Sequence, residues 1–331
     1  MARVRIADVA KRAGVSPATV SLVLHDRPGP SAATRMAVRE AVTELGYRPD
    51  RSARSLARKD SHLLGVVLDV THPFHGVMVD ALDTAAEQVG FDMVLSSITA
   101  RRNGRSALET LVDSRCSGVV LLGWDADSLG PDMLSDPVPV VVIGRTGAGP
   151  AVGIMADDLI GLRLGVTHLA QLGHERIAHV DGGRGAVSTS RRAGYRAAMR
   201  ARGWWASRLV IPGGDTESAG MKAGERIASM PRNERPTGIV AFNDRCALGV
   251  RDALLRQGID VPGDLSVVGY DDSPLAQLAT VDLTSVSQDP PALARACIDT
   301  IRAGLAGRPV RDEVVEPYLV VRGSTGPVPT T

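Results

Sequence analysis

Several polar side chains follow short apolar segments of the chain, at places where a ligand could reach them. Asp69, Asn243 and Asp271 each close such a segment, and Trp124 follows another. Carboxylate and amide groups exchange hydrogen bonds with hydroxyl groups, and an aromatic ring can cover the apolar face of a sugar. These residue types predict a binding site for a small hydroxylated molecule.

Helix capping is the competing interpretation for these residues, because Asp, Asn and Ser are ordinary where a strand leads into a helix. We favour capping for Asp244 and Asp272, which directly follow two of the polar strand ends. Arg191 is expected to start a helix after a cap region at Ser188–Ser190. Its rigid guanidinium fork would suit a ligand better than a cap.

The sequence carries no motif of a common enzyme class. GxxxxGK, HExxH and GxSxG are absent, and the glycines at 182–186 lack the spacing of a dinucleotide-binding loop. The sequence has three cysteines, Cys116, Cys246 and Cys297, which lie far apart. Their odd number and wide spacing fit neither a disulfide framework nor a zinc cluster. We therefore expect no cofactor, no metal and no enzymatic activity.

Strand and helix patterns alternate from residue 63 onward and must position the polar residues. The helices carry glycine at their C-terminal ends, as at 157–172 before Gly173 and 244–257 before Gly258. Fully apolar strands alternating with helices indicate parallel, doubly wound α/β sheets covered on both faces, where ligands bind beyond the carboxyl ends of the strands. The expected strands are 63–70, 91–98, 118–123, 138–144, 176–182, 237–243, 265–271 and 314–321.

The N-terminal segment has a different composition. Residues 1–60 hold 12 Lys or Arg against 6 Asp or Glu, while the whole chain has a net charge of only +1. A basic segment on a mildly acidic body favours contact between that segment and a polyanion. A solvated charged surface is the alternative on charge alone.

The same segment has the pattern of a helix-turn-helix. Ile6, Val9 and Ala10 recur at helical spacing before Gly14, and Ser16 followed by Pro17 is a strong signal for a new helix. A third helix is expected from a cap at Ser31 to Gly46. Two short helices joined by a glycine-containing turn are typical of DNA-binding proteins, although a three-helix domain without a DNA role has the same pattern.

Eight blocks of the sequence, in order, resemble the lactose-repressor/galactose-repressor (LacI/GalR) family of transcription regulators. They span nearly the whole chain: IADVAKRAGVSPATVS at 6–21, VREAVTELGYRPD at 38–50, ARSLAR at 53–58, THLAQLGHERIAHVDG at 167–182, RRAGY at 191–195, AFNDRCALG at 241–249, DLSVVGYDD at 264–272 and SVSQD at 285–289.

The resemblance implies that the second helix lies in the major groove of DNA. Pro17, Ala18 and Leu22 would then face base edges, Thr19 and Ser21 would face phosphates, and Leu56 would wedge into the minor groove from a hinge helix. Because the first three are apolar, readout would depend on thymine methyl groups and DNA shape. The full set of expected DNA contacts is Ser16, Pro17, Ala18, Thr19, Ser21, Leu22, His25, Thr34, Tyr47, Arg51, Arg54 and Leu56.

For the effector site, the matching positions are Phe74, His75, Arg191, Asn243 and Asp271. Asp69 and Trp124 are added from their positions after expected strands. An Arg–Asp–Asn set with an aromatic residue resembles the sugar-binding members, so a mono- or disaccharide is the expected effector. A nucleobase or nucleoside would suit the same arginine and aromatic ring.

Together these features predict a helix-turn-helix headpiece at 1–49, a hinge at 50–60 and a two-lobed core, resembling periplasmic binding proteins, at 61–331. The N-lobe is expected at about 61–160 plus 289–319, and the C-lobe at about 161–288 plus 320–331. We expect a bacterial, cytoplasmic, nucleoid-associated repressor. A homodimer would bind palindromic double-stranded operator DNA under the control of a small-molecule effector.

Two other classes fit the sequence less well. A solute receptor of the periplasmic type would leave residues 1–60 without a function. A sugar-modifying enzyme would need a set of catalytic residues, and the sequence shows none. A dimer is expected in preference to a tetramer, because the tail after Arg322 is too short and too rich in Gly and Pro to build a helix. No run of about 20 apolar residues occurs, so we expect no contact with a membrane.

Overall fold

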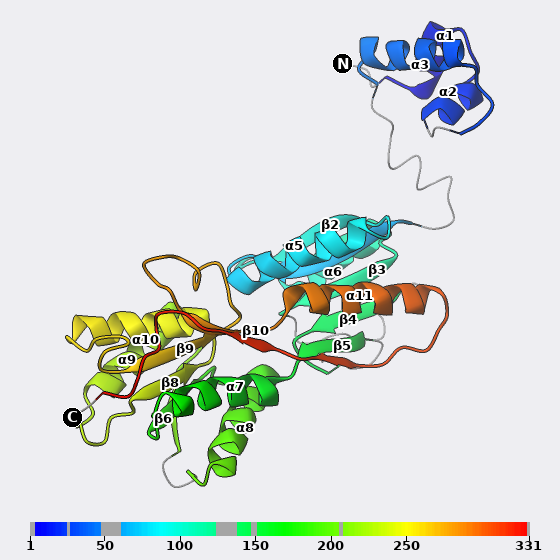
Figure 1. Ribbon diagram of the computed structural model, residues 1–331. Helices are drawn as coiled ribbons and strands as arrows, with labels where there is room; N and C mark the ends of the chain where they lie inside the picture. The colour runs from blue at the N-terminus through cyan, green and yellow to red at the C-terminus, as the bar shows by residue number, and fades with distance from the viewer. Residues whose placement is uncertain are drawn as a thin grey trace. The chain divides into compact units, whose positions relative to one another are not determined.

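The computed structural model describes residues 4–24, 27–47, 61–123, 138–146, 151–204 and 208–329 (Figure 1). These residues fall into two compact units, Met1–Ser61 and His62–Thr331, and each is described by itself. The expected contacts of His25, Arg51, Arg54, Leu56 and Trp124, and the expected hinge helix, lie outside the described residues.

The first unit contains the predicted helix-turn-helix: α1 (Ile6–Ala13), α2 (Pro17–Leu24) and α3 (Ala32–Glu44). Gly14 ends α1 in the left-handed conformation, with a φ of 66°, where glycine has no Cβ to clash. The Ser16 hydroxyl accepts the Thr19 N–H at 3.1 Å at the start of α2, and Ser31 caps α3 in the same way. A small core holds the three helices together: Val9, Ala10, Val20, Val23, Val38 and Ala41.

The second unit consists of two lobes, and the N-lobe is built on a parallel sheet of six strands in the order β11-β5-β4-β3-β1-β2. Helices α5 and α11 pack on one face of this sheet, and α6 packs on the other. The elements are β1 (Leu63–Asp69), α5 (Pro73–Glu87), β2 (Asp92–Ile98), α6 (Gly104–Asp113), β3 (Gly118–Leu122), β4 (Val140–Ile143), β5 (Ala151–Ala156), α11 (Pro290–Leu305) and β11 (Glu313–Val315).

The C-lobe has a similar sheet in the order β12-β10-β9-β8-β6-β7, in which only β12 runs antiparallel to its neighbour. Helices α7 and α8 pack on one face, and α9 and α10 pack on the other. The elements are α7 (Asp158–Gln171), β6 (Ile177–Asp181), α8 (Ala186–Ala201), β7 (Leu209–Pro212), α9 (Glu217–Ala228), β8 (Gly238–Ala241), α10 (Asp244–Arg256), β9 (Ser266–Tyr270), β10 (Thr284–Ser287) and β12 (Tyr318–Val320). The predicted doubly wound, two-lobed core is confirmed.

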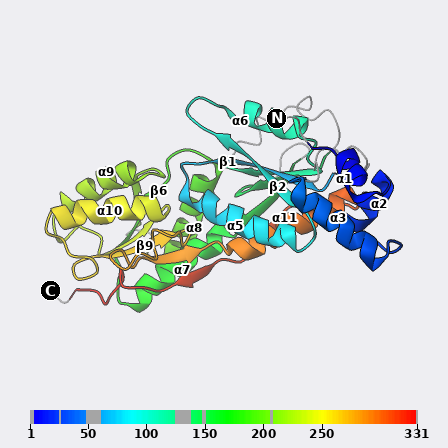
Figure 2. The ribbon, with the colours of Figure 1, turned by 90° about the horizontal axis from the view of Figure 1, so that it is seen from above.

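The chain passes between the lobes three times, after β5, after β10 and between β11 and β12. Figures 1 and 2 show the two lobes lying end to end with these segments between them. The single strand expected at 314–321 is wrong, because β11 pairs with β5 in the N-lobe and β12 pairs with β10 in the C-lobe. Pro317 lies between them, where it cannot donate a hydrogen bond to a ladder.

Candidate functional site

A cavity of about 730 Å³ lies between the two lobes, at the carboxyl ends of the parallel strands of both sheets. Asp69, Phe74 and His75 line it from the N-lobe. Arg191, Asn243 and Asp271 line it from the C-lobe. The structure thus brings together every residue of the expected effector set that it describes.

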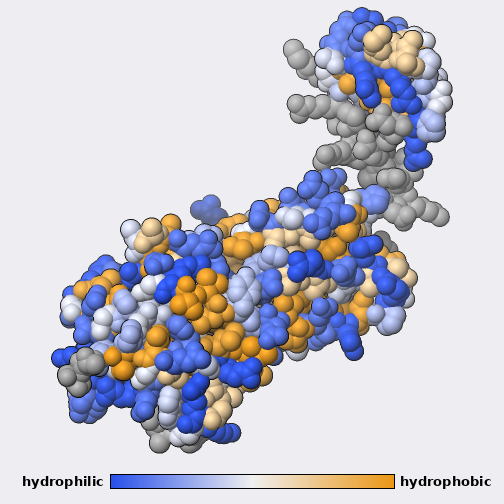
Figure 3. Space-filling model, in the orientation of Figure 1, coloured by the Kyte–Doolittle hydropathy of each residue, from blue (hydrophilic) through white to orange (hydrophobic). Residues whose placement is uncertain are grey.

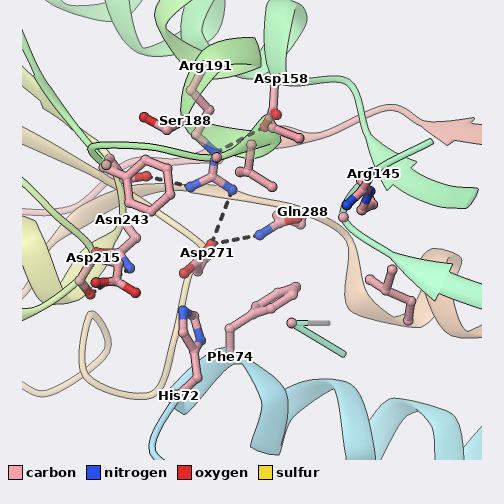
Figure 4. A pocket seen from close by; sticks show the side chains of 18 of the residues that line it. His72, Phe74, Arg145, Asp158, Ser188, Arg191, Asp215, Asn243, Asp271 and Gln288 are labelled. Atoms are coloured by element: carbon pink, nitrogen blue, oxygen red, sulfur yellow. Dashed lines mark hydrogen bonds and ion pairs between the residues drawn. The ribbon is translucent and has the colours of Figure 1, made fainter. Parts of the chain in front are cut away.

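Arg191 lies at the centre of the C-lobe wall with 4% of its surface exposed (Figure 4). Its Nε donates to Asp158 Oδ1 at 3.1 Å, and a terminal nitrogen donates to the Phe242 carbonyl oxygen. Its other terminal nitrogen lies 3.7 Å from Asp271 Oδ1. The guanidinium carbon is 3.6 Å from the centre of the Tyr270 ring and 4.8 Å from that of Phe242. Arg191 is therefore held rigidly by two carboxylates and two aromatic faces.

The expected start of helix α8 is wrong. The helix begins at Ala186, after Gly185, so Ser188 and Arg191 both lie inside it. Ser188 does not cap the helix, because its hydroxyl donates to the Gly183 carbonyl oxygen at 2.9 Å. Gly185 has a φ of 128° and turns the chain from β6 into the helix without a side-chain cap.

Burial shapes the electrostatics of this wall. It alone would lower the pKa of Arg191, but Asp158, Tyr270 and Asp271 together outweigh it, and the pKa is raised. Burial also raises the pKa of Asp271 to about 6, against the opposing effect of the Arg191 cation. Gln288 Nε2 donates to Asp271 Oδ1 at 2.7 Å and fixes that carboxyl group in the cavity wall. The result is a preorganised set of hydrogen-bonding groups against which a ligand could dock.

Asn243 does cap a helix, as its place in the sequence allows: its Oδ1 accepts the Cys246 N–H at 2.9 Å at the start of α10. Its Nδ2 donates to the Asp215 carbonyl oxygen at 3.1 Å. It also lines the cavity, so capping and a place in the site are compatible at this position.

The capping interpretation is wrong for Asp244 and Asp272. Asp244 is buried below the cavity, where it accepts the Ser273 N–H at 2.7 Å and the Ser285 hydroxyl. Burial and the nearby Asp271 charge raise the pKa of Asp244 to about 7. Asp272 has a left-handed φ of 49° and pairs with Arg322 at 2.7 Å, so it holds the C-terminal segment against the C-lobe.

Sequence reasoning missed several residues of the site. Asp158 and Gln288 hold Arg191 and Asp271, and each follows a short strand that the sequence pattern did not reveal. Phe242 lies one residue before Asn243, inside a segment that was interpreted as strand. Further cavity residues that were not expected are His72, Arg145, Arg184, Ser188 and Asp215.

His72 and His75 lie at the start of α5 with their rings stacked, 4.6 Å between centroids. His75 is buried, and its Nδ1 lies 3.0 Å from the Asp69 carbonyl oxygen. Gly123 leaves room for its ring, because a Cβ there would lie 2.6 Å from the ring. Burial lowers the pKa of His75 to about 4 and also lowers the pKa of His72, so both rings are neutral near pH 7.

In the headpiece, the expected base-reading residues lie on the surface of α2. Ser16, Pro17, Ala18 and Leu22 are exposed, whereas Thr19 and Ser21 are half-buried. Thr34 is half-buried at the start of α3. Tyr47 packs against the headpiece core, so only part of its side chain is accessible.

Two findings limit other interpretations of the described residues. None of the helices seen there combines the length and the apolar character that a bilayer-crossing helix requires. Within the same parts of the chain, no three His, Cys, Asp or Glu side chains are grouped so that they could hold a metal ion.

Comparison with known proteins agrees with both units. Residues 5–50 match the model of the bacterial regulatory proteins of the lacI family, and residues 166–325 match that of a periplasmic binding protein-like domain. The chain is 34% identical over 311 residues to the transcriptional regulator GalS of Salmonella typhimurium, covering 92% of this chain and 91% of GalS.

Solved structures share the fold. A LacI transcriptional regulator from a Rhodococcus species is 44% identical, with a TM-score of 0.77 over 81% of this chain and all of that chain. The lac repressor dimer bound to operator and the anti-inducer ONPF is 30% identical, with a TM-score of 0.82 over 98% of this chain and all of its own. The complex of the regulator CelR with cellobiose is 31% identical, with a TM-score of 0.68 over 97% of this chain and all of its own.

A helix-turn-helix unit joined to a two-lobed core with a cavity between its lobes defines the class of DNA-binding transcription regulators that carry an effector-binding domain. Within that class, the chain belongs to the LacI/GalR family.

Proposed function

We propose that the protein is a repressor whose affinity for operator DNA is controlled by a sugar bound in the interlobe cavity. The observation that carries this proposal is the arrangement of Arg191 and Asp271. Asp158 holds Arg191, Gln288 holds Asp271, and Arg191 lies over the Phe242 ring. Such a wall offers charge-assisted hydrogen bonds to hydroxyl groups and an apolar face to a sugar ring. The relative CelR, solved with cellobiose, supports a sugar effector.

On the DNA side, we propose that a homodimer binds a palindromic operator through α2, with Pro17, Ala18 and Leu22 at base edges. Their exposure on α2 supports this assignment. The lac repressor was solved as a dimer bound to operator, and a symmetric dimer matches two half-sites related by a two-fold axis. Figure 3 shows patches of hydrophobic residues on one face of the core, and such patches suit a subunit contact.

Thermal-shift measurement tests the effector. A panel of D-galactose, D-ribose, maltose and cellobiose, with adenine and guanosine beside them, should give a raised melting temperature for at least one sugar. Asp271→Asn keeps the size of the side chain, and we expect it to lose most of that shift. If only a nucleobase or nucleoside raises the melting temperature, the effector belongs to that class and not to the sugars. If the sugar raises the melting temperature of Asp271→Asn as much as that of the parent, the effector does not bind at Asp271.

Gel-shift experiments test DNA binding. Fragments of the DNA that flanks the gene should include at least one palindromic site that the purified protein retards, and the effective sugar should change the affinity. Leu22→Ala tests the reading helix, because it removes an exposed apolar side chain from α2 without disturbing the headpiece core. If the purified protein retarded no fragment specifically at moderate salt, the proposed role as a transcription regulator would be contradicted.

A further inference from the structure

Most polar groups that line the cavity already have hydrogen-bond partners within the protein. Arg191 donates to Asp158 and to the Phe242 carbonyl oxygen, and both ends of the Asn243 amide are used. Ser188 donates to the Gly183 carbonyl oxygen. These groups are therefore positioned by bonds within the protein before a ligand binds.

His72 is different. It lines the cavity, and its Nδ1 is shielded from solvent but has no hydrogen-bond partner in the described part of the chain. It precedes the first residue of α5, yet its side chain makes no capping hydrogen bond to that helix. A shielded polar atom without a partner costs free energy, so it requires an explanation.

The ring of His72 is held in place from the N-lobe. It stacks on His75, whose Nδ1 lies at hydrogen-bond distance from the Asp69 carbonyl oxygen. The His75 ring packs against Gly123, where a side chain would collide with it. In Figure 4, His72 points from the start of α5 toward Asp271, with Asp215 to one side. The orientation is therefore set by the protein and does not depend on the contents of the cavity.

The lobes already touch next to this residue. Arg245 is clamped by Glu217 at 2.6 and 2.8 Å, and it also donates to the Thr71 carbonyl oxygen of the N-lobe at 3.3 Å. His72 is the next residue along the chain. A ligand that bonded to His72 on one side and to Asp271 on the other would link the two lobes beside this contact.

We propose, on the basis of the sugar-effector function above, that His72 is a ligand-binding residue and hydrogen-bonds a hydroxyl group of an uncharged sugar. The ligand then joins the N-lobe through His72 to the C-lobe through Asp271. Its occupancy is thereby coupled to the relative position of the lobes, since it makes these contacts together only in one arrangement.

The chemistry of the ring and of its surroundings selects the hydroxyl group. A neutral imidazole has one donor and one acceptor nitrogen, which matches a hydroxyl group that both donates and accepts. At the position of His72 itself, a phosphate or carboxylate would require a cation, whereas burial lowers the pKa of His72 and favours the neutral ring. Asp69, Asp215 and Asp271 line the same cavity and can accept hydrogen bonds from hydroxyl groups, and Arg145, Arg184 and Arg191 line it as donors.

The test uses the full-length protein and the sugar from the panel above that raises its melting temperature most. His72→Phe keeps a ring that can stack on His75 but removes both nitrogens, and we expect about a tenfold weaker affinity by calorimetry, the effect of one hydrogen bond. His72→Asn keeps a hydrogen-bonding group and should restore part of the affinity. Without sugar, His72→Phe should melt at or slightly above the parent, because it removes a shielded nitrogen that has no partner, and His72→Asn should melt slightly below it, because it loses the stack on His75.

Deoxy analogues of the same sugar locate the contact. For the analogue that lacks the bonded hydroxyl group, the parent and His72→Phe should bind equally, because the removed contact is already absent. Parental affinity of His72→Phe for the intact sugar would overturn the role of His72 and leave the proposed function standing. If glucose 6-phosphate or galacturonate raised the melting temperature and the neutral sugars did not, the proposal of an uncharged ligand would be wrong. No shift by any sugar would contradict the sugar effector and this inference together.

Discussion

At the scale of single residues, the carboxyl groups in and near the cavity wall have opposite electrostatic conditions. Burial alone would raise the pKa of Asp69, but the two hydrogen bonds from Thr71, together with His75 and His72, lower it and stabilise the anion. Asp244 and Asp271 lie deeper, and burial raises the pKa of each toward neutrality. The two buried carboxyl groups thus hold protons at a pH where an exposed aspartate has lost them.

This difference predicts a pH dependence of stability to which Asp244 contributes together with Asp271. The pKa of Asp244, about 7 in the folded protein, exceeds the ordinary value of 3.8, so the folded state binds more protons between these pH values and its free energy of unfolding falls as the pH rises. Asp244→Asn retains a carbonyl oxygen for the Ser273 N–H and removes the charge. Relative to the parent, it should gain on the order of 2 kcal/mol between pH 5 and pH 8 in urea denaturation.

A control for this prediction lies on the same helix. Asp252 is exposed at the surface of α10 and pairs with Arg256, so Asp252→Asn should shift stability by the same amount at both pH values. The buried histidines His75 and His179 have lowered pKa values and contribute the opposite trend, but they are common to all variants and cancel in the comparison. Parallel pH profiles for Asp244→Asn and the parent would contradict the raised pKa.

At the scale of elements, the closest helix contact in the C-lobe joins α9 to α10 through two glycines. A Cβ on Gly249 would lie 1.9 Å from the Glu217 carbonyl oxygen, and one on Gly220 would lie 2.1 Å from that of Cys246. Both obstacles are backbone atoms, which cannot turn aside as a side chain can. The contact holds the start of α10, and with it Asn243, at the edge of the cavity.

Gly249→Ala should therefore force the two helices apart, at a cost of about 3 kcal/mol or more in the free energy of unfolding. Gly76→Ala is the matched control, since Gly76 lies in helix α5 with nothing within 4 Å of the added Cβ. Alanine there should stabilise the protein by up to about 1 kcal/mol because of its higher helix propensity. Thermal melts of the two variants should move in opposite directions, and equal melting temperatures would refute the close packing.

The elements also show which parts of the fold can be predicted from sequence. Long apolar strands and helices with clear caps were located from the pattern, as at β1, α7 and α10. Strands β5, β7 and β10 were missed, because they are short and carry Gly153, Pro212 or several Ser and Thr residues in place of an apolar run. Their partners in the sheet stabilise them, and those partners are distant in sequence.

The candidate site shows the same division. Polar residues at the ends of recognisable strands were found, but the residues that hold them in place were not. Asp158 and Gln288 follow missed strands, and the buried position of Asp244 depends on β10, whose Ser285 binds it. A residue that acts through a tertiary contact gives no periodic signal along its own segment.

At the scale of the whole molecule, the division at residue 61 predicts that the core is autonomous. A chain of residues 62–331 contains both sheets and every described residue of the cavity. It should fold and show the same sugar-dependent shift in melting temperature as the full chain, and it should not retard operator DNA. A fragment that lost the sugar shift while still folded would show that the headpiece contributes to the cavity.

The three passages of the chain between the lobes have a consequence for how such a protein can be recombined. Neither lobe is one continuous stretch, since the N-lobe sheet includes β11 and the C-lobe sheet includes β12. A gene fusion can exchange the headpiece with one cut near residue 61, whereas exchanging a single lobe requires three coordinated cuts. DNA recognition can therefore be shuffled between relatives as a unit, while the two lobes and the ligand cavity between them are inherited together.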